Sequence, residues 1–479
     1  MASDSHLLST AILATHWLIV VALSLRVLHR KLPVGVSLAW LAVVYAVPFV
    51  GAAAYLMLEG KRLDAGWRER HAEAEREAAP ALRALREAGS AVELPAGSVG
   101  EPLWRETLGV LGTPALGGNR LQLLDDFGRV FDALVADIEA ARTSCRLAFY
   151  IWQEGGRSDE VLAAILSAHA RGVRCRVLVD AMGSSAFLGG AGCARLRAAG
   201  VAVVAALPRS FVRRADLRYH RKSVVIDDRV AYTGSQNLVD PRFFKREAGV
   251  GQWVDAMVRL EGPAVALIAR QFEVDWAVDA MQPFEAAAPS PDRVATNGAV
   301  LQVVPSGPTP HPDMIRQLTL TAIYAARRTL TITTPYFVPD DAVLTALRSA
   351  ANAGVAVTVI VPAKNDSVLV QFASAATYEE VLAAGIRIVL HEGGLLHTKS
   401  LVVDGALSLF GSVNLDMRSF WLDFEVSLFI YDEAFAAELG ALQESYIQNS
   451  ATLDAEDWRS RSGRHRLLEN AARLVGPLL

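Results

Sequence analysis

The chain has 479 residues, which is enough for two or three domains. Its formal net charge is −4, and this slightly acidic balance argues against a protein that binds broadly along nucleic acid, because such proteins usually carry a basic stripe. The three cysteines, Cys145, Cys175 and Cys193, lack C-x-x-C spacing and indicate buried thiols in a reducing compartment rather than a disulfide framework or a zinc site.

The N-terminal segment contains two long apolar runs, at residues 5–25 and 34–58. Each is long enough to cross the roughly 30 Å hydrocarbon core of a membrane as a helix. A cleaved signal peptide is less favoured, because no basic segment precedes the first run and no clear cleavage site follows it. We therefore expect a membrane hairpin at residues 1–60. Basic residues flank the second run at both ends, so the positive-inside rule barely decides how the hairpin is oriented in the membrane. The free cysteines favour a catalytic region on the cytoplasmic side.

A linker is expected after the hairpin, at residues 61–118. Residues 67–87 are rich in Ala, Glu and Arg, with opposite charges three or four positions apart, which is typical of a solvated helix. Residues 94–118 contain Pro and Gly and indicate a loop region.

The remaining chain repeats one pattern of strands and helices. The matching segments are strands at residues 146–152 and 330–336, helices at 159–170 and 340–353, strands at 173–180 and 355–361, and strands at 200–204 and 385–389. Strands that alternate with helices of this length predict an α/β fold with a largely parallel sheet. Residues 283–312, rich in Pro, Ser and Ala, are the expected junction. We therefore predict two α/β domains at residues 119–285 and 286–452, and a tail at 453–479.

An H-x-K-x-x-x-x-D pattern occurs once in each domain, as HRKSVVID at residues 220–227 and HTKSLVVD at 397–404. Each copy is followed at the same distance by a G-S-x-N element, at residues 234–237 and 411–414. One copy alone would fit a structural histidine or a metal ligand equally well. The duplication of both elements favours a catalytic site, and a metal centre fits poorly because two lysines would sit beside the cation.

The residue types in these motifs suit chemistry on a phosphodiester. Side chains two apart on a strand share one face, so His220 and Lys222 should point into a common pocket, as should His397 and Lys399. The lysines would neutralise the phosphate while one imidazole attacks phosphorus and the other protonates the departing oxygen, giving a phosphohistidine. The expected uncharged donors to the phosphate are Ser235, Asn237, Ser412 and Asn414.

Each imidazole also needs a carboxylate to orient it. Alignment of the strand that starts at Trp421 with the one that starts at Trp253 gives Glu425 and Asp255 as equivalent candidates. Glu247 competes with Asp255, because its spacing from His220 is closer to that of Glu425 from His397. Two acids complete the catalytic motifs, Asp227 and Asp404, but they lie at the far ends of their strands, where we expect them to hold loops.

Two basic segments have more than one interpretation. The first, before and within the first motif, is either a solvated surface cluster or an attractor of anionic lipid headgroups; it comprises Arg209, Arg213, Arg214, Arg218 and Arg221. The second, at residues 459–466, leads into an apolar end at 467–479. This tail is either a membrane-surface contact or a helix packed on the catalytic body.

The paired motifs resemble those of the phospholipase D superfamily over roughly residues 121–450. Three further runs are similar to bacterial cardiolipin synthases: TPYFVPD at 334–340, VPFVGAAAY at 47–55 and ARLVGPLL at 472–479. The resemblance implies a transmembrane helical hairpin followed by two phospholipase D-like α/β repeats, packed as a pseudo-dimer with the active site between them. One departure is Tyr219, where the family pattern has a small polar residue such as Asn.

The resemblance also implies an activity, which is transfer of a phosphatidyl group from one phosphatidylglycerol to another, giving cardiolipin and glycerol. It implies no metal or other cofactor, anionic phospholipids as partners and a multi-pass protein of the bacterial inner membrane. By family tendency His220 is the nucleophile and His397 the acid and base. Alternatives are a hydrolase, a transferase with another acceptor alcohol, or an inactive scaffold that binds anionic lipid. Oligomeric state stays open.

Overall fold

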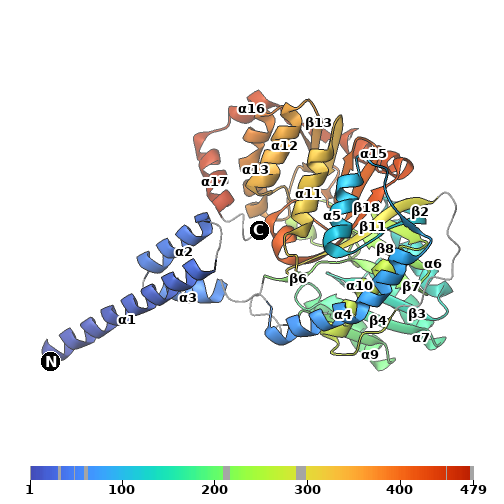
Figure 1. Ribbon diagram of the computed structural model, residues 1–479, viewed down its shortest axis with the longest axis horizontal. Helices are drawn as coiled ribbons and strands as arrows, with labels where there is room; N and C mark the ends of the chain where they lie inside the picture. The colour runs from blue at the N-terminus through green and yellow to red at the C-terminus, as the bar shows by residue number, and fades with distance from the viewer. Residues whose placement is uncertain are drawn as a thin grey trace. The chain divides into compact units, whose positions relative to one another are not determined.

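The computed structural model describes residues 2–30, 34–47, 49–58, 63–208, 216–286, 298–448 and 450–474 (Figure 1). The chain divides into two compact units. One holds residues 1–67 with residues 209–217, and the other holds residues 68–208 and 218–479. Both predicted α/β repeats therefore fall within the second unit, the catalytic body.

The N-terminal unit contains the helices α1 (Ala2–His29), α2 (Val34–Ala46) and α3 (Val50–Leu58). The segment Ser9–His29 of α1, with a mean hydropathy of 2.0, is long and apolar enough to span a membrane. The prediction of one continuous helix over residues 34–58 was wrong, because this run forms two shorter helices of 13 and 9 residues. Pro48, outside the described residues, falls between them, and a proline cannot donate the backbone hydrogen bond that a continuous helix needs. The three helices pack through a shared apolar cluster that includes Val20, Val27, Val44 and Tyr55.

The linker contains α4 (Ala65–Glu87), the short strand β1 (Ala91–Val92) and α5 (Glu101–Leu111). A helix is confirmed at residues 67–87 as α4, which continues through Pro80, but it is not solvated all round, because His71, Ala74 and Ala78 are buried along one face. A salt bridge between Glu75 and Arg270 fastens α4 to the catalytic body. The predicted loop region is therefore shorter than expected, because α5 occupies part of it.

The first half of the catalytic body, from β2 to α10, forms a mixed sheet in the order β5–β4–β3–β7–β8–β10–β2. Its strands are β2 (Ala115–Leu124), β3 (Ser144–Phe149), β4 (Arg174–Asp180), β5 (Ala202–Ala206), β7 (Ser223–Ile226), β8 (Val230–Gly234) and β10 (Met257–Glu261). Strands β3, β4 and β5 are parallel, and the others are antiparallel to their neighbours. The motif strand β7 lies beside β3, near the centre of the sheet.

The second half, from β11 to α15, repeats this order as β14–β13–β12–β16–β17–β18–β11. Its strands are β11 (Ala299–Ser306), β12 (Thr329–Thr333), β13 (Ala356–Pro362), β14 (Arg387–His391), β16 (Ser400–Val403), β17 (Leu407–Gly411) and β18 (Asp423–Tyr431), and β19 (Ser450–Thr452) adds an edge strand beside β14. Strand β2 is antiparallel to both β10 and β11 and so joins the two sheets. The predicted pair of α/β repeats is confirmed.

Helices cover both faces of each sheet, as expected for parallel strands buried on two sides. The first half has α6 (Phe127–Ala140), α7 (Arg157–Ala170), α8 (Ser185–Leu188), α9 (Ala191–Ala198) and α10 (Val265–Asp279). The second half has α11 (Met314–Ala325), α12 (Asp341–Asn352), α13 (Val368–Ala383), α14 (Met417–Trp421) and α15 (Glu433–Gln448), with α11, α12 and α13 side by side in Figure 1. Helices α10 and α15 contribute to one apolar core with strands of both halves, which holds the pseudo-dimer together.

The tail contains α16 (Ala455–Arg459) and α17 (Gly463–Leu474), while residues 475–479 lie outside the described residues. Helix α17 packs on α13, where Ala472 joins Val370 and Ala373 in a small apolar cluster. The described part of the tail is thus a helix on the catalytic body, although Leu467 and Leu474 are exposed.

The motif aspartates close two equivalent turns, one between β7 and β8 and one between β16 and β17. Asp227 and Asp404 have positive φ angles of 53° and 52°. The carboxylate of Asp227 accepts backbone N–H bonds of 2.7–2.9 Å from residues 142–144, and that of Asp404 accepts equivalent bonds of 2.8–2.9 Å from residues 327–329. Burial raises the pKa of Asp227, but these N–H bonds outweigh it and hold the pKa below its usual value. Both aspartates fix loops, as expected.

We predict that Asp227→Ala and Asp404→Ala each lower the free energy of unfolding by about 1–3 kcal/mol, because each leaves several backbone N–H groups without their acceptor. Thermal melting of the purified protein in detergent would measure the loss. Glu139→Ala, at an exposed position on α6, is the control and should melt like the wild type. Normal melting of both variants, together with lost turnover, would instead assign the aspartates to the chemistry.

Candidate active site

The two motif histidines line one cavity of about 260 Å³ between the halves. His220 and His397 are 7% and 2% exposed, so each imidazole is almost fully enclosed by protein. The ring of Tyr150 lies edge-on to His220 at 4.8 Å, and Trp253 lies 4.4 Å from His397. The structure therefore brings together the two imidazoles that the sequence places 177 positions apart.

Two short parallel strand pairs cross between the halves and bring each histidine to a carboxylate. Strand β6 (Arg218–Tyr219) pairs with the start of β18, so that Tyr219 lies opposite Phe424. Strand β15 (Leu395–Leu396) pairs with β9 (Trp253–Val254), so that Leu396 lies opposite Val254. The residues that follow the first pair are His220 and Glu425, and those that follow the second pair are His397 and Asp255. Each motif histidine is thus brought beside a carboxylate of the other half.

Each imidazole is consequently oriented by the opposite half. Nδ1 of His220 donates to Glu425 at 2.8 and 2.9 Å, and Nδ1 of His397 donates to Asp255 at 2.6 Å. Because Nδ1 is engaged, Nε2 is the ring nitrogen available for chemistry in both residues.

The sequence identified these carboxylates but compared each with the histidine of its own half, and that comparison was wrong about the pairing. Glu247, the competing candidate, is exposed on a 3₁₀ turn (Arg246–Ala248). Spacing within one half could not find the partners, because they are selected by the pairing of strands between halves.

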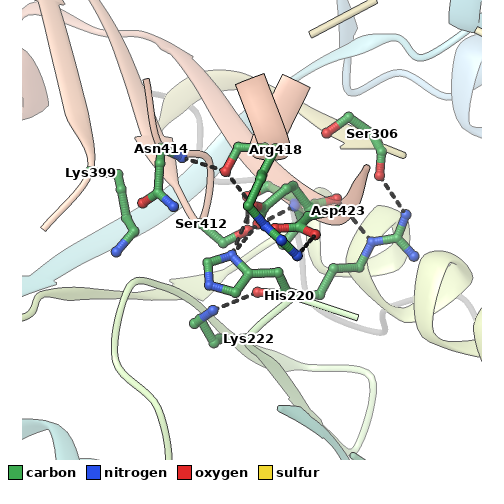
Figure 2. A network of polar contacts seen from close by, with 12 residues as sticks. His220, Lys222, Ser306, Lys399, Ser412, Asn414, Arg418 and Asp423 are labelled. Carbon is green, nitrogen blue, oxygen red and sulfur yellow. Dashed lines mark hydrogen bonds and ion pairs between the residues drawn. The ribbon is translucent and has the colours of Figure 1, made fainter. Parts of the chain in front are cut away.

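The motif lysines are tied to the backbone of their own histidines. Nζ of Lys222 donates to the carbonyl oxygen of His220 at 2.6 Å, and Nζ of Lys399 donates to that of His397 at 2.5 Å. Figure 2 shows the Lys222 contact. Burial lowers the pKa of Lys222 to about 8 and that of Lys399 to about 7, against the opposing pull of nearby carboxylates. An anionic substrate would favour the charged form of both.

The serines and asparagines of the G-S-x-N elements have different positions. Oγ of Ser235 accepts the N–H of Ala256 at 3.1 Å, and Oγ of Ser412 accepts the N–H of Val426 at 3.0 Å. These backbone groups follow Asp255 and Glu425, so the serines fix the carboxylate strands, and the prediction that they face the phosphate was wrong. Their hydroxyls are engaged by backbone and buried.

The asparagines do line the cavity. Oδ1 of Asn237 accepts the N–H of Ile151 at 3.1 Å, which leaves its amide N–H groups as donors. The backbone N–H of Asn414 donates to Ser419 at 3.2 Å, and the same serine donates to Glu425 at 2.9 Å. The asparagines therefore keep the expected position of phosphate donors.

The two histidine–carboxylate pairs differ in electrostatics. Burial raises the pKa of Glu425 to about 7. Burial also disfavours ionised Asp255, but the imidazole of His397 outweighs it and lowers the pKa of Asp255 to about 2. Burial lowers the pKa of His397 to about 4. Burial also lowers the pKa of His220 well below its ordinary value, and the nearby positive charge of Lys222 lowers it further. His397 thus has the firmer anionic partner and is better suited to carry a proton.

Sequence reasoning missed several charged cavity residues, among them Asp416, Arg418 and Asp423. Arg418 and Asp423 form an ion pair of 3.5 Å beside His220 (Figure 2). Alternation along the strand could have revealed Asp423, since it lies two residues before Glu425 and shares its face. Across the mouth, Lys245 of the first half pairs with Asp366 of the second at 2.9 Å.

One cluster has the spacing of metal ligands, because donor atoms of His220, Asp423 and Glu425 lie within 4.8 Å of one another. Its donors are already engaged, His220 with Glu425 and Asp423 with Arg418. The buried ammonium group of Lys222 lies close enough to influence the pKa of His220. The donor set therefore fits proton sharing and anion binding better than a bound cation.

The predicted basic cluster is divided by the structure. Arg209, Arg213 and Arg214 lie outside the described residues, and Arg218 lines the cavity. Arg221 is buried, where it forms an ion pair with Asp275 and donates to the backbone oxygens of Glu425 and Ser306. Tyr219 also donates to Asp275, at 2.8 Å. Arg221 was therefore wrongly assigned to the surface, and Tyr219 belongs to a buried network behind the site.

Comparison with known proteins agrees with this geometry. The family described as "Cardiolipin synthase, PLD-like domain" matches residues 134–276 and 319–446. Cardiolipin synthase A of Edwardsiella ictaluri (strain 93-146) is 43% identical over 97% of both chains, and that of Yersinia pseudotuberculosis serotype O:1b (strain IP 31758) is 44% identical over the same share. In fold, the chain resembles phosphatidylserine synthase of Haemophilus influenzae Rd KW20, with a TM-score of 0.61 and 17% identity over 78% of this chain and 99% of the other. The duplicated motifs, the shared cavity and these matches show that the chain belongs to the phospholipase D-like cardiolipin synthase family.

Proposed function

We propose that the protein is a cardiolipin synthase that transfers a phosphatidyl group from one phosphatidylglycerol to the terminal hydroxyl of another. The observation that carries this proposal is the reciprocal orientation of His220 and His397 in one cavity by carboxylates of opposite halves. Two imidazoles with Nε2 available at one phosphate provide a nucleophile and an acid.

In the first step, Nε2 of His220 attacks phosphorus and the bond from phosphorus to the glycerol oxygen breaks. Nε2 of His397 gives its proton to that oxygen, and glycerol leaves. Both imidazoles are neutral in the free site because burial lowers their pKa values. The negative charge of the bound diester raises the proton affinity of His397, whose imidazolium form Asp255 stabilises.

In the second step, the phosphatidyl group on His220 is transferred to the second lipid. Nε2 of His397 takes the proton of the acceptor hydroxyl, the new oxygen–phosphorus bond forms and the nitrogen–phosphorus bond breaks. The amides of Asn237 and Asn414 and the charges of Lys222 and Lys399 stabilise the phosphate oxygens throughout. The products are cardiolipin and glycerol.

The acceptor alcohol distinguishes this reaction from hydrolysis, which would release phosphatidic acid. Aromatic side chains from both halves, Tyr150, Trp253 and Tyr336, line the cavity and restrict the space open to water. We therefore favour an alcohol acceptor. A product assay with labelled phosphatidylglycerol tests this: cardiolipin and glycerol support the proposal, and phosphatidic acid alone contradicts it.

The proposed location is the bacterial inner membrane. Helix α1 contains a segment with the length and hydropathy of a membrane span, and α2 and α3 pack with it. We propose that these helices anchor the chain as a multi-pass protein with a cytoplasmic catalytic body, which is consistent with its free, buried cysteines.

We predict that His220→Ala and His397→Ala each reduce turnover by about 10³-fold or more, because the two residues act as one unit. His397→Ala, which retains the nucleophile, should become labelled by phosphatidylglycerol carrying ³²P, whereas His220→Ala should not. The label on the protein would be measured after rapid denaturation at alkaline pH. Label on His220→Ala would reverse the two roles. Substantial activity in both variants would exclude this mechanism.

We predict that chelation leaves the chemical step intact, because buried lysines and amides supply the charge stabilisation. Turnover in mixed micelles would be compared with and without EDTA. Complete loss of activity that one specific cation restores would contradict the proposal.

We predict that the fall of kcat/KM with rising pH, which begins with loss of the His397 proton, steepens to form a second alkaline limb at about pH 7–8, because Lys399 and Lys222 titrate at about 7 and about 8. The charged lysines are present below these values and are lost as the pH rises through them. Lys399→Arg should lower kcat but move this limb upward, since a guanidinium stays protonated. An unchanged alkaline limb in this variant would show that another group controls it.

A further inference from the structure

The outer face of α17 is apolar where a helix on a protein surface normally carries polar residues. Leu467, Ala471 and Leu474 recur at intervals of four and three residues, and Leu467 and Leu474 are 70% and 83% exposed. The opposite face, which packs on α13, holds Ala472 and the buried Glu469. The apolar stripe is therefore not used in the core of the catalytic body.

The stripe is part of a larger apolar rim at the cavity mouth. Ser367 and Val370, in the first turn of α13, line the cavity, while Val368 and Leu369 between them are exposed. In the first half, Phe243 lies two residues before the cavity-lining Lys245 and is 58% exposed. We define the apolar rim as Phe243, Val368, Leu369, Leu467, Leu468 and Leu474.

An ion pair holds the two sides of the rim together. Lys245, two residues after Phe243, pairs at 2.9 Å with Asp366, two residues before Val368. Both ion-pair residues also line the cavity. The exposed apolar side chains of both halves consequently flank the entrance through which a substrate reaches the histidines.

The charge around the rim has one sign on α17. Its exposed face carries Arg464 and Arg466, whereas its acid, Glu469, is buried and bonded to Arg461. Exposed leucines interleaved with arginines suit the boundary between anionic headgroups and acyl chains. A protein partner would more often be matched by charges of both signs.

We propose that the apolar rim docks on the surface of an anionic lipid bilayer and holds the cavity mouth against it. This inference rests on the proposed phospholipid substrate. The lipid then enters the cavity headgroup first, and its acyl chains stay in the bilayer. Arg464 and Arg466 bind the anionic headgroups, and the leucines of α17 insert beside them.

The first test places a fluorophore on the full-length protein in phosphatidylglycerol nanodiscs. The native cysteines are buried, so a maleimide dye sensitive to polarity should label Leu467→Cys selectively. The matched control is Tyr324→Cys on α11, a hydrophobic residue with 60% exposure outside the rim. Lipids with spin labels in their acyl chains should quench the first dye and leave the second unquenched.

Equal quenching at both positions, or at neither, would overturn the proposal. A blue shift at position 467 in lipid-free detergent that grows with protein concentration would assign the rim to a second copy of the chain, and would also overturn it. This test needs no turnover, so it can fail or succeed independently of the proposed reaction.

The second test compares turnover of the double variant L467Q/L474Q with that of Tyr324→Gln. On bilayers containing phosphatidylglycerol, the double variant should lose about tenfold or more, the factor expected when a buried leucine no longer partitions. Turnover of a short-chain phosphatidylglycerol below its micelle concentration should be unchanged. Equal loss on both substrates would show a fault in the site, and no loss on bilayers would refute docking.

Discussion

The site depends on two hydrogen bonds that cross between the halves, one from His220 to Glu425 and one from His397 to Asp255. Neither half contains a complete histidine–carboxylate pair. A half on its own would hold a histidine without its orienting carboxylate and a carboxylate without its imidazole. The shared strand β2, the common apolar core and the crossing strand pairs all maintain this arrangement. Each half therefore depends on the other for the orientation of its histidine.

Burial also makes the free site less charged than its residues suggest. It lowers the pKa values of both imidazoles and both lysines, and it raises those of Asp416 and Asp423 to about 7 and about 6. A phosphodiester that enters this site brings the negative charge that favours protonated lysine and protonated His397. In the proposed mechanism the catalytic charges thus develop together with substrate binding, which concentrates stabilisation on the reacting phosphate.

The sequence predicted what depends on local pattern. Alternation and spacing located both histidines, the loop-holding roles of Asp227 and Asp404, and the repeated order of strands and helices. It failed where a tertiary contact decides the outcome. The carboxylates pair across halves, Ser235 and Ser412 serve the strands of those carboxylates, and Arg221 is neutralised in the core by Asp275, which belongs to a distant helix. The broken second apolar run was detectable in advance, because Pro48 lies within it.

The size of the cavity bears on how a transferase avoids hydrolysis. About 260 Å³ accommodates a phosphate and its glycerol but not the acyl chains of a lipid, which must remain outside. If the mouth lies against a bilayer, the next headgroup is held beside the cavity at a high effective concentration. Aromatic side chains and the ion pair of Lys245 and Asp366 line the same cavity and limit the space left for water. The preference for an alcohol acceptor would then arise from the position of the mouth rather than from a dedicated group that rejects water.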